Sequence, residues 1–374
     1  MYVYHVSIDR VQTGMMLVEP VFVTNSNGKK LMIASENSTI TDRVLDLLHR
    51  YDVKTVAVLL NIKPKVMPKR DDTEELARVK PLIAPNLREK VVQHIEKIFG
   101  ILTSDPSQEA NMTTAYKSLE NFDKIVGVMT SQMLMDNRAA VHIFDVKSYD
   151  EYTFHHSLSV GVLAVSIGQQ LGLDPARIAN LGRCAILHDI GKLLIPKRIL
   201  NKAGKLTNEE FEIMKKHSEF GAQTLKEHSY GNVELWNGVM LHHEKINGKG
   251  YPRNLRNNNI PLFSRIISIA DIYDAVTSYR PYRAPMTPSD AYELIMSEAS
   301  QSLDFELVEA FFKRLTLYPL NLTVALSDNR VGLVVENNNS LRPVVRLKDT
   351  DELLDLASPK NLNLTITKVY DVKR

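Results

Sequence analysis

Histidine is concentrated in one part of this 374-residue chain, and the concentration restricts the possible folds. Seven of the 11 histidines lie between residues 155 and 243: His155, His156, His188, His217, His228, His242 and His243. Two of them directly precede a carboxylate, in His188–Asp189 and His243–Glu244. Imidazole and carboxylate donors without thiolates suit divalent Fe, Mn, Zn or Ni rather than Ca or Mg. Because helical bundles can project such side chains inward to build a dinuclear centre, the sequence predicts a bundle around metals.

The pattern of apolar residues predicts helices around the cluster and strands at both ends. Helical periodicity covers residues 154–171, 175–187, 211–217 (after a capping box from Thr207 to Glu210), 261–274 and 288–299. Short β-branched runs at 3–6, 16–23, 30–33 and 55–60 surround a predicted helix at 39–51. Further β-like runs occupy 323–326, 332–335, 344–347 and 364–369.

We therefore expect a mainly α-helical protein with four parts. Residues 1–62 form a small α+β accessory unit, and residues 63–140 form a linker and a helical segment. Residues 141–318 form the helical bundle that carries the histidines, and residues 319–374 form a β-rich C-terminal extension. A chain of this length is expected to divide into more than one domain.

Composition excludes several classes of protein. With 46 Lys+Arg against 44 Asp+Glu, the formal net charge of +2 gives no broad electrostatic case for a nucleic-acid polymer or a membrane surface. One cysteine, Cys184, excludes an intramolecular disulfide framework and a cysteine-rich zinc site, and we interpret it as a small buried apolar residue. The N-terminus does not have the pattern of a signal peptide, and no apolar run reaches the ~18 residues of a membrane span. We expect a cytoplasmic location.

Five segments, in order, resemble the HD-GYP family of cyclic-dinucleotide phosphodiesterases, a branch of the HD metallohydrolase superfamily. They are DEYTFHHSLSV, LHDIGKLLIP, ILNKAGKLTNEEFEIMKKHSEFG, LHHEKINGKGYP and ISIADIYDAVTSYRPYR, and the resemblance runs from about residue 149 to 317. It implies an HD-type helical bundle around two or three metals. It also implies hydrolysis of cyclic di-GMP to pGpG, GMP or both, by attack of a metal-bridged hydroxide.

The resemblance implies a role for each matching residue. The metal ligands would be His156, His188, Asp189 and Asp271 for one ion, and Asp189, His217 and His242 for the other, with His243 as a further ligand or a neighbour of the ligands. Lys192, four residues after His188 on what we expect to be the same helical approach, would meet the scissile phosphate. Asp189 and Lys192 are thus the catalytic candidates. The substrate would contact Lys192, Gly250, Tyr251 and Pro252 of the GYP turn, and Arg280 and Arg283.

The family pattern Tyr-Thr-x-x-His-Ser selects His156 over His155 as the ligand. Members with three metals resemble one another in having a glutamate four residues before this histidine, where this chain has Tyr152. Glu151 is one residue away, which turns a helical side chain by about 100°. We therefore favour two divalent metals over three, with Fe or Mn as the expected ions. Asn247 and Ser218 also depart from the family pattern, at positions that are not expected to be ligands.

Two alternatives remain open at this point. The chain could hydrolyse another cyclic dinucleotide, cyclic GMP-AMP, because the motifs do not distinguish guanine from adenine at the second base. It could instead be a non-catalytic module that binds a cyclic dinucleotide or acts as a scaffold. The complete set of His, Asp and GYP residues favours the enzyme. A homodimer through residues 76–140 is a further hypothesis.

Overall fold

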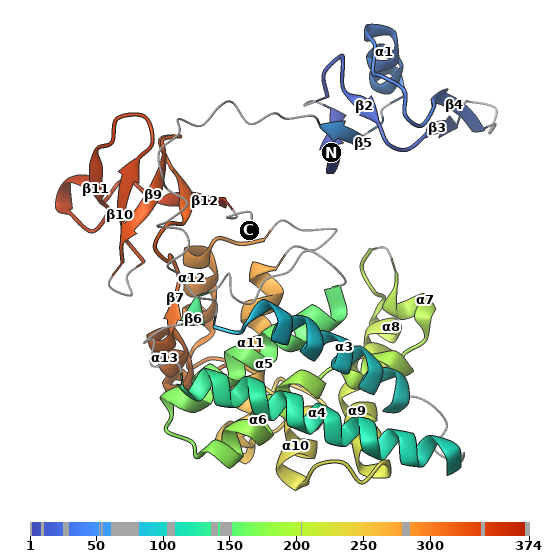
Figure 1. Ribbon diagram of the computed structural model, residues 1–374, viewed down its shortest axis with the longest axis vertical. Helices are drawn as coiled ribbons and strands as arrows, with labels where there is room; N and C mark the ends of the chain where they lie inside the picture. The colour runs from blue at the N-terminus through green and yellow to red at the C-terminus, as the bar shows by residue number, and fades with distance from the viewer. Residues whose placement is uncertain are drawn as a thin grey trace. The chain divides into compact units, whose positions relative to one another are not determined.

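The computed structural model describes residues 2–8, 11–24, 30–51, 53, 55–60, 82–102, 109–135, 141–142, 152–202, 204–278, 285–337 and 341–370. The chain separates into two compact units, Met1–Glu75 and Leu76–Arg374 (Figure 1). In the described part of the chain, no helix is both long enough and apolar enough to cross a membrane.

The N-terminal unit is a small α+β fold, as the sequence predicts. Strands β1 (Tyr2–Ser7), β5 (Thr55–Leu60) and β2 (Met16–Leu17) form an antiparallel sheet in the order β1-β5-β2. A separate hairpin joins β3 (Val21–Thr24) to β4 (Lys30–Ala34), so the single run expected at 16–23 is divided between two sheets. Helix α1 (Asp42–Arg50) starts after the N-cap Thr41 and buries Leu48 in the core of the unit.

The C-terminal unit is predominantly helical. Its α-helices are α3 (Pro85–Leu102), α4 (Glu109–Met135), α5 (Tyr152–Gln170), α6 (Pro175–Leu187), α7 (Lys197–Leu200), α8 (Asn208–Lys215), α9 (His217–Glu227), α10 (Val233–Leu241), α11 (Leu262–Thr277), α12 (Pro288–Glu298) and α13 (Phe305–Arg314). Asp174 caps α6 with Pro175 in its first turn, and Thr207 and Glu210 form the predicted capping box of α8.

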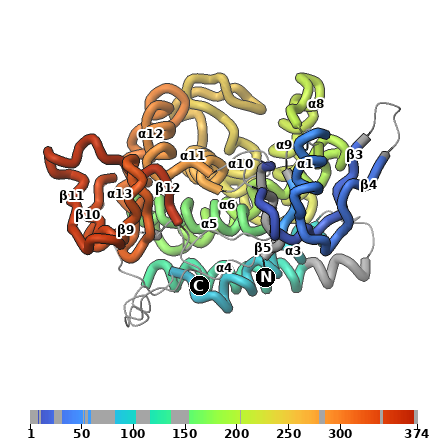
Figure 2. The backbone as a smooth tube through the Cα atoms, turned by 90° about the horizontal axis from the view of Figure 1, so that it is seen from above, coloured from blue at the N-terminus to red at the C-terminus, as the bar shows by residue number. Residues whose placement is uncertain are grey.

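Helices α5, α6 and α11 form the centre of this unit, and their apolar faces are buried against one another. Figures 1 and 2 show α3 and α4 along one side of this centre. Ile95 and Phe122 from these two helices belong to the same hydrophobic core as Leu181 and Ile267. Met129 and Met133 are also buried in that core, so in this chain they serve helix–helix packing.

A five-stranded antiparallel sheet forms the C-terminal region. Its strands are β8 (Thr323–Leu326), β9 (Val331–Glu336), β10 (Val344–Leu347), β11 (Leu353–Asp355) and β12 (Ile366–Tyr370), in the order β11-β10-β9-β8-β12. Strand β11 is additional to the four predicted runs. Strands β6 (Val141–His142) and β7 (Leu315–Thr316) pair in parallel, and so connect the chain between α4 and α5 to the chain directly after α13.

Two sequence predictions beside the histidines differ from the structure, the helical placement of Lys192 and the end of the helix expected at 211–217, whereas α6 ends at Leu187 as predicted. Helix α6 ends at Leu187, and the segment from Ile190 to Leu194 is a 3-10 helix (η3), so Lys192 does not continue the α-helix of His188. The helix expected at 211–217 ends at Lys215, and His217 is the first residue of α9. Both breaks turn polar side chains towards the interior of the bundle.

Candidate metal centre

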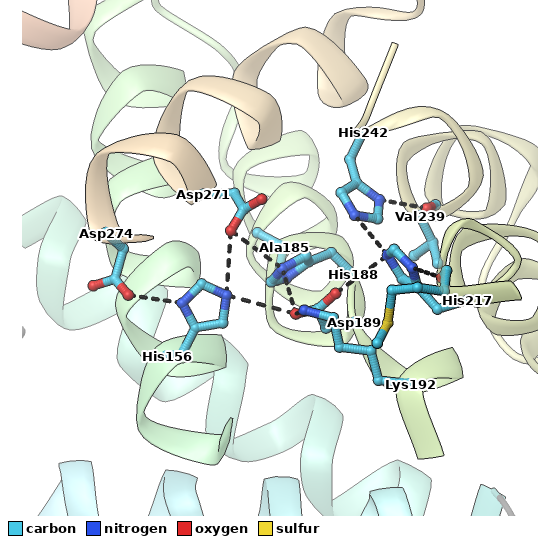
Figure 3. A network of polar contacts seen from close by, with 11 residues as sticks. His156, Ala185, His188, Asp189, Lys192, His217, Val239, His242, Asp271 and Asp274 are labelled. Carbon is cyan, nitrogen blue, oxygen red and sulfur yellow. Dashed lines mark hydrogen bonds and ion pairs between the residues drawn. The ribbon is translucent and has the colours of Figure 1, made fainter. Parts of the chain in front are cut away.

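Asp189 lies at the centre of the histidine cluster, between the end of α6 and η3 (Figure 3). Its Oδ2 is 3.3 Å from Nε2 of His188 and 3.6 Å from Nε2 of His156. Its Oδ1 is 3.4 Å from Nε2 of His217. The side chain is 2% exposed, so one buried carboxylate faces imidazoles on both sides.

The structure brings the predicted ligands together from five segments. His156 lies on α5, His188 ends α6, His217 begins α9, His242 follows α10, and Asp271 lies on α11. Two groups have ligand atoms within 4.8 Å of one another: Asp189 with His217, His242 and His243, and Asp189 with His156 and His188. Asp271 Oδ1 completes the second group, 3.3 Å from His156 Nε2 and 4.0 Å from His188 Nε2.

The orientation of three rings is fixed by backbone carbonyl groups that lie three residues earlier in the chain. Nδ1 of His188, His217 and His242 lies 2.6–2.7 Å from the carbonyl oxygen three residues earlier, of Ala185, Met214 and Val239 respectively. A carbonyl can only accept, so Nδ1 carries the proton and donates it. Each Nε2 then presents a lone pair to the cluster. Nε2 of His217 and His242 are 3.4 Å apart, a spacing that suits donors to a common cation.

Burial and charge favour the metal-binding protonation states of His242, His243 and Asp189. Burial and the neighbouring imidazoles hold the pKa of His242 well below its usual value, and burial lowers the pKa of His243 to about 3. Burial opposes ionisation of Asp189, but Lys192 and His188 outweigh it and keep the pKa of its carboxyl well below the usual range. Neutral imidazole and ionised carboxylate are the forms that bind metal.

The donor set of the cluster fits a divalent cation. His188 Nε2 and Asp189 Oδ1 are buried and make no hydrogen bond in the part of the chain that the structure describes. Buried polar atoms are normally satisfied, so such a pair indicates a partner other than protein. Cys184 is fully buried in the core, as predicted, and its thiol donates to Leu235 O at 3.3 Å. The cluster therefore could bind metal through nitrogen and oxygen alone.

A glycine contact holds the two halves of the cluster together. A Cβ added to Gly191 would lie 2.0 Å from His217 O and 2.5 Å from Gly221 N. No other residue type permits this approach of η3 to the first turn of α9. The glycine of the HDIGK motif thus positions His217 opposite Asp189.

The GYP turn closes over the group that contains His217, His242 and His243. The Tyr251 ring lies 4.7 Å from the His243 ring and tilts from it by 31°. A Cβ on Gly250 would lie 2.3 Å from Lys245 N, so this position too requires glycine. Pro252 follows Tyr251 through a cis peptide bond and is half-buried. The Tyr251 ring therefore lies beside the candidate ligand His243, and an aromatic ring of this kind can stack on a base.

Lys192 approaches the cluster from its partly exposed side. Its Nζ is 2.5 Å from Asp189 Oδ2, three residues earlier, at 32% side-chain exposure. A substrate phosphate can therefore reach this ammonium group. Arg280 and Arg283, the other predicted phosphate or guanine contacts, lie outside the described residues.

Two acidic residues of the site were not predicted from the sequence. Asp274 Oδ2 lies 2.7 Å from Nδ1 of His156, and the i, i+3 spacing from Asp271 was the available signal. Glu244 is buried and accepts from the backbone N–H groups of Arg253 at 2.6 Å and Leu255 at 2.9 Å. Its place directly after His242 and His243 was the signal that it belongs to the GYP turn.

We expect the Glu244→Gln substitution to raise KM for the substrate roughly tenfold, because one of two buried hydrogen bonds to the turn is lost at about 1–3 kcal/mol. The ligands are untouched, so metal content should stay constant and kcat should change by less than about twofold. Steady-state kinetics with elemental analysis measure both. Glu219→Gln, which changes an acid near the same Arg253 on the surface, is the matched control. An unchanged KM would mean that the turn orders without Glu244.

This geometry is accompanied by similarity to known proteins. Residues 133–307 match the HD domain family. A Pseudomonas aeruginosa protein named cyclic di-GMP phosphodiesterase PA4108 is 31% identical over 305 residues, which cover 81% of this chain and 70% of that protein. A Vibrio cholerae protein named 3'3'-cGAMP-specific phosphodiesterase 3 is 35% identical over 251 residues, and the match covers 66% of this chain and 52% of that protein.

The fold is similar to that of a solved structure, Bd1817, a HDG"Y"P protein from Bdellovibrio bacteriovorus. The TM-score is 0.50 at 17% sequence identity, and the match covers 83% of this chain and 98% of that one. At this identity the likeness supports the fold alone, an HD-type helical bundle. Together with the HD domain match and the extent of the P. aeruginosa similarity, it confirms the family expected from the motifs: the chain belongs to the HD-GYP family of the HD metallohydrolase superfamily.

Proposed function

We propose that the chain is a metal-dependent phosphodiesterase that hydrolyses cyclic di-GMP to pGpG, GMP or both. One observation carries the proposal: the buried carboxylate of Asp189 faces histidine groups on both sides, as a bridge between two metals requires. The P. aeruginosa relative, which matches 81% of this chain, is named a cyclic di-GMP phosphodiesterase and supports the substrate.

The proposed centre holds two divalent ions, Fe or Mn. The first ligand set is His156, His188, Asp189 and Asp271, and the second is Asp189, His217 and His242 with His243 beside them. When bound, the ions supply Lewis-acid polarisation of a phosphoryl oxygen and a nucleophile from water. A third ion would need a further carboxylate, and Glu151 lies outside the described residues, immediately before α5.

Protein side chains bind and orient the substrate around this centre. The Lys192 ammonium group neutralises charge that develops on the phosphoryl oxygens, and it can give a proton to the leaving 3'-oxygen. The Tyr251 ring stacks on a purine, at a contribution of about 1–3 kcal/mol. Glu244 holds the GYP turn through two backbone hydrogen bonds, and the turn keeps the Tyr251 ring beside His243. A cytoplasmic location and a homodimer through residues 76–140 stay predictions from the sequence.

The test combines metal analysis with product analysis on anaerobically purified full-length protein. We expect about two metals per chain, in line with a dinuclear centre. Cyclic di-GMP and 3'3'-cGAMP are supplied separately at equal concentration, and chromatography follows pGpG, GMP and the mixed linear product. Faster turnover of cyclic di-GMP is the expected result. Chelation should abolish turnover, and added Mn²⁺ or Fe²⁺ should restore it.

Each other outcome selects a different function. Preferential turnover of 3'3'-cGAMP would assign the substrate for which the V. cholerae relative is named. Metal binding without hydrolysis of either cyclic dinucleotide would contradict the enzyme and favour the binding or scaffold module.

A further inference from the structure

The ring of His156 is held differently from those of the other clustered histidines. His188, His217 and His242 each donate Nδ1–H to a neutral backbone carbonyl of their own chain segment. His156 Nδ1 instead lies 2.7 Å from a carboxylate oxygen, Oδ2 of Asp274, 118 residues away in sequence. Because a carboxylate is an anionic acceptor, this hydrogen bond is stronger than the other three.

Helix α11 supplies a carboxylate to each nitrogen of the His156 ring. Asp271 Oδ1 lies 3.3 Å from Nε2, and Asp274, one turn further along, lies at Nδ1 (Figure 3). Asp274 is itself fixed: it is 3% exposed, and the Ser278 hydroxyl donates to its Oδ1 at 3.2 Å. Asp274 is thus a buried carboxylate next to the histidine cluster, and both of its oxygens accept hydrogen bonds.

Burying a carboxylate costs free energy unless it is paired. If Asp274 served only to hold the His156 ring in place, a neutral acceptor such as a backbone carbonyl would do this as well. A carboxylate behind a metal-bound histidine has two further effects. It fixes the tautomer and the direction of the ring, and it makes Nε2 a stronger electron-pair donor.

We propose that Asp274 is a positioning residue of the metal centre: its carboxylate accepts the Nδ1–H of His156 and aims Nε2 at the cation held with His188, Asp189 and Asp271. This inference rests on the proposed function for the assignment of His156 as a ligand. It makes the two ion positions unequal, since the position with His217 and His242 depends on carbonyl-supported rings only. The first position therefore binds its ion more tightly because of Asp274.

The test is a Mn²⁺ titration of chelator-treated, full-length protein, in which the electron paramagnetic resonance signal reports free Mn²⁺. Asp274→Asn keeps the size of the side chain and an acceptor oxygen but removes the charge. We expect one of the two Mn²⁺ affinities to fall about 10–100-fold and the other to change by less than about twofold. With Co²⁺, the visible absorption of the affected site should shift, because the donor strength of His156 falls.

Asp304→Asn is the matched control. Asp304 pairs with Arg265 of the same helix α11 at 2.5 Å, outside the cluster, so its loss tests general destabilisation of that helix. The control should leave both Mn²⁺ affinities unchanged. Unchanged affinities in Asp274→Asn, or an equal loss in Asp304→Asn, would overturn the proposal. Protein that binds Mn²⁺ but does not hydrolyse cyclic di-GMP would contradict the proposed function, and the comparison of the two variants would still decide the role of Asp274.

Discussion

Replacement of Asp189 by asparagine is expected to cost the centre its metals and to lower kcat/KM at least about 10³-fold. The two oxygens of Asp189 face His156 and His188 on one side and His217 on the other. Asparagine keeps the shape but turns one oxygen into a donor group and removes the bridging charge. Metal catalysis of this type contributes several kcal/mol, and a loss of about 4 kcal/mol corresponds to three orders of magnitude in rate.

Elemental analysis and product chromatography on the same sample measure both effects of Asp189→Asn. Asp123→Asn is a suitable control, because Asp123 is likewise a carboxylate with two partners, accepting from Tyr230 and pairing with Arg183 at 3.2 Å, but it lies outside the cluster. The control should keep its metals and its rate. Should Asp189→Asn retain two metals per chain and near-normal turnover, Asp189 is not the bridge, and the mechanism proposed here fails at its centre.

The site residues that could be predicted from the sequence are those that lie close together in short motifs. His188 and Asp189 are adjacent, His242 and His243 are adjacent, and Tyr251 lies in the same motif as that second pair. Helical periodicity around these motifs was enough to expect that they meet inside a bundle. The structure brings the ligand atoms of these histidines and of Asp189 within 4.8 Å of one another in two groups, and the residue types required no tertiary information.

The missed residues depend on how distant segments cross. Asp271 was expected as a ligand from the family resemblance, but only the packing of α11 against α5 shows that Asp274, one turn further along, lies at Nδ1 of His156. Glu244 resembles a surface acid until the turn folds back and buries it. The parallel pair of β6 and β7 joins a two-residue strand before α5 to a two-residue strand after α13, and no local pattern could reveal this pairing.

The helical placement of Lys192 and the end of the helix expected at 211–217 were wrong for a related reason. Periodicity detects a helix but not the backbone contact that ends it. At η3 the α-helix gives way to a 3-10 helix where Gly191 meets the backbone of α9. The HDIGK glycine was recognised in the sequence as part of a motif, but its function as a contact surface between two backbones is visible only in the structure.

Because of that contact, we expect the Gly191→Ala variant to lose both stability and activity, which is the second large effect. The added Cβ would stand 2.0 Å from His217 O and 2.5 Å from Gly221 N, and neither atom belongs to a flexible side chain. Overpacking of this kind costs about 1–3 kcal/mol or more. Helix α9, which would have to move, begins at His217, so we also expect weaker metal binding at the site that contains His217. A displacement of this side chain near 1 Å would lower the rate about 10²-fold.

Gly127→Ala is the matched control for Gly191→Ala, because nothing lies within 4 Å of a Cβ added at Gly127 in α4. In a helix interior that change should raise the free energy of unfolding by about 0.5–1 kcal/mol and leave turnover unaltered. Urea unfolding with excess chelator separates the packing cost from the loss of metal, and a repeat with Mn²⁺ adds the binding contribution. If Gly191→Ala unfolds like the unaltered protein under chelation and keeps its turnover, η3 can move away from α9 without disturbing His217, and the glycine contact does not set the geometry of the centre.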